Sequence, residues 1–132
     1  MIVIDASVVS NVVGDDGAAG RLARARIAAA AAVSAPDLVD VDTVSVLRKR
    51  WLAGGLTARR FRSAIEDLRA LPIVRFPSGP LMFRAYELRA NVTPYDATYV
   101  GLAEGLDCTL VTGDGRLARA PGIKCKVEIL TA

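Results

Sequence analysis

The sequence opens with MIVIDAS, residues 1–7, in which a short aliphatic run leads directly into Asp5. Such a run predicts a strand that is buried on both faces. Ligand and catalytic sites in open α/β sheets lie at the carboxyl ends of the strands, so Asp5 stands where such a site would form. The alternative is that Asp5 only caps the helix that follows, as aspartate often does.

A second stretch near the other end of the chain repeats this arrangement. In TLVTGD, residues 109–114, another short apolar strand ends on an aspartate, Asp114. Hydrophobic periodicity, glycines and prolines predict further strands at residues 31–35, 72–76 and 126–130, and helices at 17–29, 38–52, 57–71, 80–90 and from 93 onward.

The alternation of strands and helices predicts a single α/β domain over residues 1–132, with a doubly wound parallel sheet and helices on both faces. We expect the common strand order 3-2-1-4-5, in which the first and fourth strands are neighbours at the switch point. Asp5 and Asp114 would then lie side by side at the carboxyl edge of the sheet.

The composition excludes several kinds of catalytic site. The chain has 132 residues, a net charge of +3 and no histidine, which rules out Ser-His-Asp triads and histidine-ligated zinc. Its two cysteines, Cys108 and Cys125, fit no metal-ligand spacing. Apolar runs are too short to span a bilayer, and the first residues lack the features of a secretory signal. We therefore expect a soluble cytoplasmic protein with no membrane partner.

Further aspartates occur at the starts of two predicted helices. Asp96 follows Thr93 and Pro94, which is a favourable way to begin a helix. Asp40 and Asp42 lie among aliphatic residues in the first turns of the helix at 38–52, where an unpaired acid is costly. The periodicity of this helix leaves open which of the two points into a site.

If Asp5, Asp96, Asp114 and one of these two acids converge, their charges need compensation. At ~5 Å and an effective dielectric of ~20, each pair of carboxylates repels by about 3 kcal/mol. Either some of the carboxylates are protonated or a cation lies among them, and ligands that are all oxygen favour Mg²⁺ or Mn²⁺. Such an ion could activate water and stabilise charge on a phosphodiester without histidine. Asp5, Asp96 and Asp114 can each be explained as residues that cap a helix, and Asp42 or Asp40 has the least such explanation, but the predicted convergence favours the metal site.

Four motifs in this order resemble the PIN-domain family, specifically the small VapC-type toxins of bacterial toxin–antitoxin pairs. The motifs are IVIDAS at 2–7, Ala35-Pro36 with an acid six residues after the proline, Tyr95-Asp96-Ala97 with Tyr99-Val100 and Ala103-Glu104, and LVTGD at 110–114 with Leu117.

The resemblance implies a PIN-like fold and a metal-dependent ribonuclease with four catalytic acids, which are Asp5, Asp42, Asp96 and Asp114. It implies that Asp5, Asp96 and Asp114 hold Mg²⁺ or Mn²⁺. The family usually has glutamate at position 42, so the shorter aspartate favours a water-bridged contact, with Asp40 as the reserve candidate. Ser7 and Thr112 match polar positions that could orient the carboxylates, metal-bound water or phosphate. The family also implies a homodimer, inhibition by a cognate antitoxin, and a structured RNA substrate such as tRNA or rRNA.

The favoured interpretation is therefore an endoribonuclease in which arginines hold the RNA backbone, and Arg116 is the arginine nearest in sequence to a predicted acid. One alternative is a catalytically weak PIN-like module, in which the shortened acid Asp42 leaves a protein that binds RNA or an antitoxin without turnover. A receiver-like phospho-acceptor domain is disfavoured because Ala6 stands where the second acid of such a domain would follow Asp5.

Overall fold

The computed structural model describes all of residues 1–132 and contains one five-stranded sheet. All four pairs of neighbouring strands are parallel, and their order is β3-β2-β1-β4-β5, which confirms the predicted fold. The strands are β1 (Ile2–Ile4), β2 (Val33–Pro36), β3 (Val74–Phe76), β4 (Thr109–Thr112) and β5 (Val127–Ile129).

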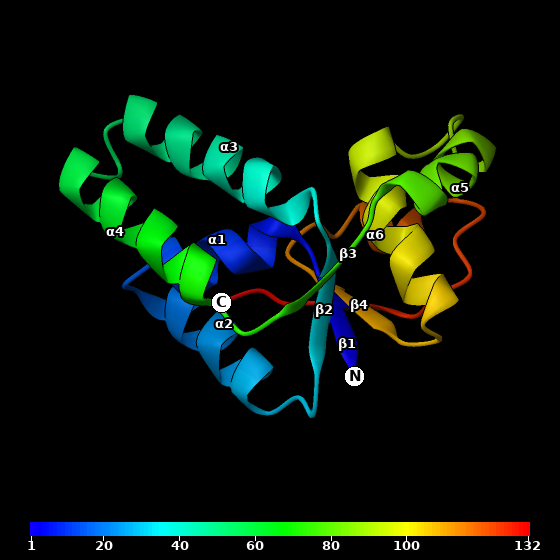
Figure 1. The fold of residues 1–132 in the computed structure, drawn as a ribbon, viewed down its shortest axis with the longest axis horizontal. Coiled ribbons are helices and arrows are strands. Elements are labelled where there is room, and N and C mark those ends of the chain that lie inside the picture. The colour runs from blue at the N-terminus through cyan, green and yellow to red at the C-terminus, as the bar shows by residue number, and fades with distance from the viewer.

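The helices cover both faces of the sheet, as predicted. Figure 1 shows the first four helices on one side of the sheet and the last two on the other. The helices are α1 (Ala6–Gly14), α2 (Ala18–Ala28), α3 (Val39–Leu52), α4 (Ala58–Ala70), α5 (Met82–Glu87) and α6 (Pro94–Gly105), with short 3-10 turns η1 (Gly79–Leu81) and η2 (Leu117–Arg119). None of these helices combines the length and the apolar character needed to cross a membrane.

The central strand β1 is buried along its whole length, as its aliphatic sequence predicts. Its neighbours are β2 and β4, and Ile4 is paired with Val111. The next residues along these two strands are Asp5 and Thr112, so they emerge together at the carboxyl edge of the sheet. Parallel pairing therefore brings the two ends of the sequence to one place, which is the switch point of the topology.

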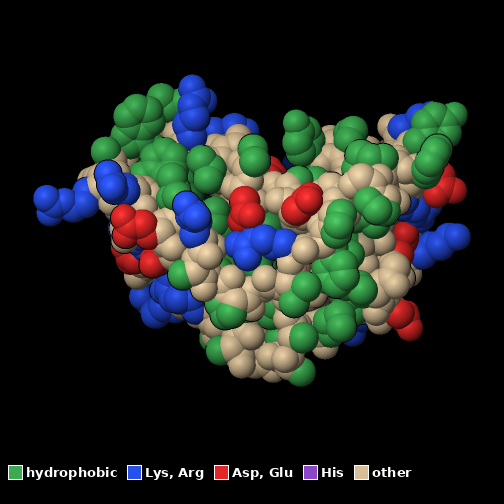
Figure 2. Space-filling view, in the orientation of Figure 1, with side chains coloured by type: hydrophobic (Ala, Val, Ile, Leu, Met, Phe, Trp, Pro, Cys, Tyr) green, Lys and Arg blue, Asp and Glu red, His purple; other side chains and the backbone are tan.

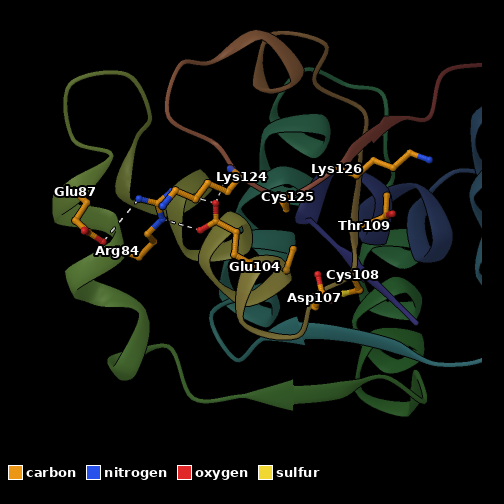
Figure 3. Close-up of a pocket in the computed structure, with 10 residues that line it drawn as sticks. Arg84, Glu87, Glu104, Asp107, Cys108, Thr109, Lys124, Cys125 and Lys126 are labelled. Atoms are coloured by element: carbon orange, nitrogen blue, oxygen red, sulfur yellow. Dashed lines mark hydrogen bonds and ion pairs between the residues drawn. The ribbon is translucent and has the colours of Figure 1, made fainter.

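A hollow at the opposite edge of the sheet is bridged by an ion pair. Arg84 of α5 donates two hydrogen bonds to Glu104 of α6, at 2.7 and 3.0 Å, and the Lys124 amide donates to the same carboxylate at 2.7 Å (Figure 3). The hollow lies near the start of β4 and contains none of the predicted site residues. The Glu104 carboxylate thus ties three segments of the fold together, away from the acids of the other edge.

We expect Glu104→Gln to lower the free energy of unfolding at pH 7 by about 1–3 kcal/mol, because charge-assisted hydrogen bonds are lost from a largely buried group. Burial by itself would raise the pKa of Glu104, but the hydrogen bonds from Arg84 and Lys124 outweigh it and lower the pKa below the ordinary 4.5. The stabilisation is therefore present above pH 4.5 and is lost as the pH falls through the lowered pKa of the folded state.

Urea denaturation at several pH values measures this difference. Glu87→Gln is the matched control, because Glu87 lies 3.7 Å from the same Arg84 but is largely exposed. Equal stabilities of the two variants at pH 7 would contradict the role given to Glu104.

Candidate active site

Asp5 lies at the junction of β1 and α1 and is buried, with only 6% of its surface exposed. Its Oδ1 accepts hydrogen bonds from the amides of Ser7 and Val8, at 3.1 and 3.2 Å, and from the Ser7 hydroxyl at 2.5 Å. Asp5 is therefore the N-cap of α1. Its second oxygen, Oδ2, accepts a hydrogen bond from the Thr112 hydroxyl of β4. Burial raises the pKa of Asp5, and these hydrogen bonds oppose the rise.

The hydroxyls of Ser7 and Thr112 join the two strand ends. The Ser7 hydroxyl, which donates to Asp5, accepts from the amide of Gly113 at 2.9 Å. The Thr112 hydroxyl likewise donates to Asp5 and accepts from the amide of Asp114 at 3.0 Å. A Cβ atom at Gly113 would lie only 3.2 Å from the Ser7 oxygen, so a side chain there would press on this contact. The position of Asp114 is thus fixed relative to Asp5.

Asp114 is paired with the arginine that was predicted to bind RNA. The Arg116 guanidinium contacts both oxygens of the Asp114 carboxylate at 3.2 Å, and the Arg116 amide also donates to it at 2.9 Å. Hydrogen bonds from Arg116 are the main reason that the pKa of Asp114 is lowered. Arg116 itself is 85% exposed, so water screens this ion pair and a ligand can compete for either partner.

Asp96 begins α6 and has a different environment. Its amide donates to the Thr93 hydroxyl at 3.2 Å, which confirms Thr93 as the helix cap. The Asp96 carboxylate takes part in none of the ion pairs of the protein. Burial raises the pKa of Asp96, and the charges of Asp5, Asp114 and Asp42 raise it further. Asp96 is therefore close enough to the other three acids to be affected by their charges, and it forms no ion pair, although Arg116 lines the same hollow.

The structure separates Asp42 from Asp40. Oδ2 of Asp42 accepts a hydrogen bond of 3.0 Å from the phenol of Tyr99, which lies on α6 three residues after Asp96. Asp40 instead pairs with Arg75 of β3 through three contacts of 2.9–3.1 Å. Asp42 is thus directed to the same site as Asp96, whereas the charge of Asp40 is compensated elsewhere.

Tyr99 is the site residue whose role the sequence did not reveal. It is only 1% exposed, and burial, followed by the charge and hydrogen bond of Asp42, raises the pKa of its phenol. The phenol therefore stays protonated and serves as a donor to Asp42. The available signal was its spacing, because residues three apart on a helix lie on the same face.

Two hollows meet at Asp114. One, of about 220 Å³, is lined by Asp96, Asp114 and Arg116 among other residues, and the second, of about 450 Å³, is lined by Ser7, Asp114 and Arg50. Figure 2 shows the surface indented at the top of the view, between α3 and α5, with acidic side chains beside the indentation. Asp96 and Asp114 therefore line hollows of the surface that a ligand can reach.

The donor set fits a hard divalent cation in its chemistry, because every candidate ligand is a carboxylate or hydroxyl oxygen. The Asp96 carboxylate forms no ion pair and its pKa is raised, so a cation beside it would stabilise its charged form. No group of three or more acidic, cysteine or histidine side chains is already arranged as a metal-binding cluster. The structure thus shows convergence of charge rather than a preformed cage.

Comparison with known proteins defines the family. The PIN domain family matches residues 2–123. The chain is 38% identical to ribonuclease VapC9 of Mycobacterium tuberculosis over 130 residues, which cover 98% of each chain. The crystal structure of M. tuberculosis VapC20, described as a sarcin–ricin loop cleaving toxin, aligns with a TM-score of 0.70 at 19% identity over 94% of this chain and 97% of that one. The structure of VapBC2 from Rickettsia felis, bound to a DNA fragment from their promoter, aligns with a TM-score of 0.68 at 16% identity over 99% and 100%.

The chain therefore belongs to the PIN-domain family. Within this family, its identity to VapC9 over nearly the whole chain assigns it to the VapC ribonucleases. The resemblance that the sequence motifs indicated is confirmed.

We expect Thr112→Val to lower the free energy of unfolding by about 1–3 kcal/mol, because it leaves Oδ2 of the buried Asp5 and the Asp114 amide without their partner. Thr109→Val is the matched control, since Thr109 lies on the same strand and its hydroxyl makes no hydrogen bond within the protein. Chemical denaturation compares the two variants. If they are equally stable, the Thr112 hydroxyl is not needed to hold the two strand ends together.

Proposed function

We propose that this chain, as one PIN domain over residues 1–132, is a Mg²⁺- or Mn²⁺-dependent endoribonuclease. The observation that carries the proposal is the convergence of four acids at the carboxyl ends of the strands: Thr112 joins Asp5 to Asp114, Tyr99 holds Asp42 beside α6, and the half-buried Asp96 at the start of α6 forms no ion pair. Such an arrangement is typical of a cation site. The names of the VapC relatives support RNA as the substrate.

In the proposed site, Asp5, Asp96 and Asp114 hold the ion. When bound, the ion supplies Lewis-acid stabilisation of the phosphodiester and lowers the pKa of a water molecule. The hydrogen bonds from Ser7 and Thr112 favour the ionised form of the Asp5 carboxylate against its burial and hold it in place. This assigns Asp5 two roles at once, as the cap of α1 and as a ligand.

Asp42 is proposed to orient the attacking water. Its Oδ2 accepts from Tyr99, which leaves Oδ1 as the oxygen that can accept a hydrogen bond from water. This geometry suits an indirect contact of the short aspartate with the metal.

Arg116 is proposed to exchange Asp114 for an RNA phosphate once the ion is bound, since arginine binds phosphate well and this ion pair is exposed.

We further propose that the enzyme is the toxin of a toxin–antitoxin pair, with a cognate antitoxin protein, a second copy of the chain and a tRNA- or rRNA-class substrate as its partners. The similar fold in VapBC2 supports an antitoxin partner. Large apolar side chains are exposed on α3 and α5, and such patches often mark protein interfaces. They are Val41, Trp51, Leu52, Met82, Phe83 and Tyr86.

Asp5→Asn and Asp96→Asn are each expected to reduce Mn²⁺-dependent RNA cleavage by about 100-fold or more, because each removes a charged ligand worth several kcal/mol in the transition state. Both variants should stay folded, since asparagine also caps helices and Asp96→Asn removes repulsion. Asp107→Asn is the control, with the same change of charge at an exposed position next to β4's amino end. Cleavage of labelled tRNA or rRNA is the readout.

Thermal denaturation with increasing Mn²⁺ separates this enzyme from the module that binds without turnover. Binding to the folded state should raise the melting temperature of the wild type and of Asp107→Asn but not of Asp96→Asn. Full metal-dependent cleavage by folded Asp5→Asn would overturn the mechanism. A wild type that binds RNA but never cleaves it, with or without Mn²⁺, would instead support the binding module.

The different partners of Asp42 and Asp40 give opposite expectations for two matched variants. Asp42→Asn should reduce cleavage by about ten-fold or more with little loss of stability, because it weakens the orientation of the water. Asp40→Asn should leave cleavage unchanged but destabilise the fold, because Arg75 loses its charged partner. Cleavage rates and urea midpoints of the two purified variants test this, and the reverse pattern would assign the second acid to Asp40.

A further inference from the structure

Arg50 of α3 is one of two partly buried arginines of this protein that form no ion pair, and the other is Arg24. Arg26, Arg60, Arg75 and Arg84 each form an ion pair with a carboxylate. Arg50 forms none, and its guanidinium is held only by uncharged oxygens of α1. These contacts are with the Ser10 carbonyl at 3.3 Å, the Ser10 hydroxyl at 3.3 Å and the Asn11 side chain at 2.7 Å.

This charge lines the larger of the two hollows beside the acids. The hollow has a volume of about 450 Å³, within the range of ligand sites. Its lining combines polar or charged side chains, such as those of Ser7, Asn11, Arg50 and Asp114, with apolar ones, those of Val8, Ala19, Leu22, Leu130 and Ala132. A nucleotide likewise combines a charged phosphate with a base whose faces are apolar.

The hollow is also in the right place for such a ligand. Asp114 belongs both to this hollow and to the smaller one that contains Asp96 and Arg116. Asp114, one of the proposed metal ligands, therefore lines both the hollow that contains Arg116 and the hollow that contains Arg50. An RNA strand that crosses the acids would place one of its phosphates near the acids and another next to Arg50.

We propose that Arg50 binds an RNA phosphate next to the scissile one, with the base of that nucleotide against the apolar side chains of the hollow. Three of the five guanidinium N–H groups are used by Ser10 and Asn11, so two remain for phosphate oxygens. Asn11 acts as a positioning residue, because its oxygen fixes the guanidinium plane. This inference rests on the proposed ribonuclease function and adds the second contact that holds the RNA strand.

The test measures RNA affinity in the Asp96→Asn background, in which cleavage is expected to be lost. The probe is a fluorescent single-stranded oligoribonucleotide of mixed sequence, since phosphate contacts do not depend on sequence. Arg50→Ala should weaken binding by about ten-fold and should reduce the slope of log affinity against log salt by about 0.7, the value for one phosphate contact on a single strand. Arg50→Lys, which keeps the charge but not the planar fork, should be intermediate.

Arg24→Ala is the matched control for both charge and stability. Arg24 also contacts α1 through uncharged oxygens, those of Val12 and Asp15, at 3.0 and 2.9 Å, but it does not line the hollow. It should lose stability without losing RNA affinity or salt dependence. Arg50→Ala binding as tightly as Arg24→Ala would overturn the inference.

The outcomes also separate this inference from the proposed enzyme function. If the chain with native Asp96 cleaves RNA but Arg50→Ala changes neither affinity nor salt dependence, the function stands and the subsite is wrong. If affinity depends on Arg50 but no metal-dependent cleavage occurs, the subsite stands and the chain is a binding module. If the oligoribonucleotide does not bind at all, the subsite is wrong, and the enzyme function is decided by the cleavage assay on tRNA or rRNA.

Discussion

The arrangement of the site depends on the hydrogen bonds around one buried carboxylate, that of Asp5. A buried carboxylate is costly unless donors satisfy it, and this one accepts from two amides and two hydroxyls. The hydroxyls of Ser7 and Thr112 connect Asp5 to the loop after β4, because each also accepts a hydrogen bond from a backbone amide of that loop. One charge at the end of β1 thereby fixes the beginning of α1 and the loop that carries Asp114.

Around this fixed point, the acids of the carboxyl edge differ in what compensates them. Asp40 and Asp114 have arginine partners, whereas Asp42 has a phenol and Asp96 has no charged partner. These different partners give the four aspartates different roles, although their side chains are the same. A firmly paired acid stabilises the fold, and an acid that other carboxylates surround is available to a cation. Asp114 stands between the two cases, because its arginine is exposed and can be displaced.

The sequence predicted most of the fold because its signals are local. Short aliphatic strands, helices that begin at caps, and their alternation were enough to predict a parallel sheet and its order. The order then placed Asp5 beside β4, since the carboxyl ends of neighbouring parallel strands share one edge. Of the two expectations for Asp5, the structure confirms the cap, and the role as a metal ligand stays a prediction. Asp5 is a cap, and its other oxygen faces Thr112 of the neighbouring strand.

The sequence by itself determined the all-oxygen character of the site, through the lack of histidine and the aspartates that follow two strands. Only the tertiary structure decided which of Asp40 and Asp42 lies beside α6. Their spacing places them on different sides of α3, but the helix period does not say which side meets α6 and which meets β3. Asp42 is hydrogen-bonded to Tyr99, 57 residues away in the sequence, and Asp40 is paired with Arg75, 35 residues away. Pairings over such distances depend on packing, which local sequence patterns do not record.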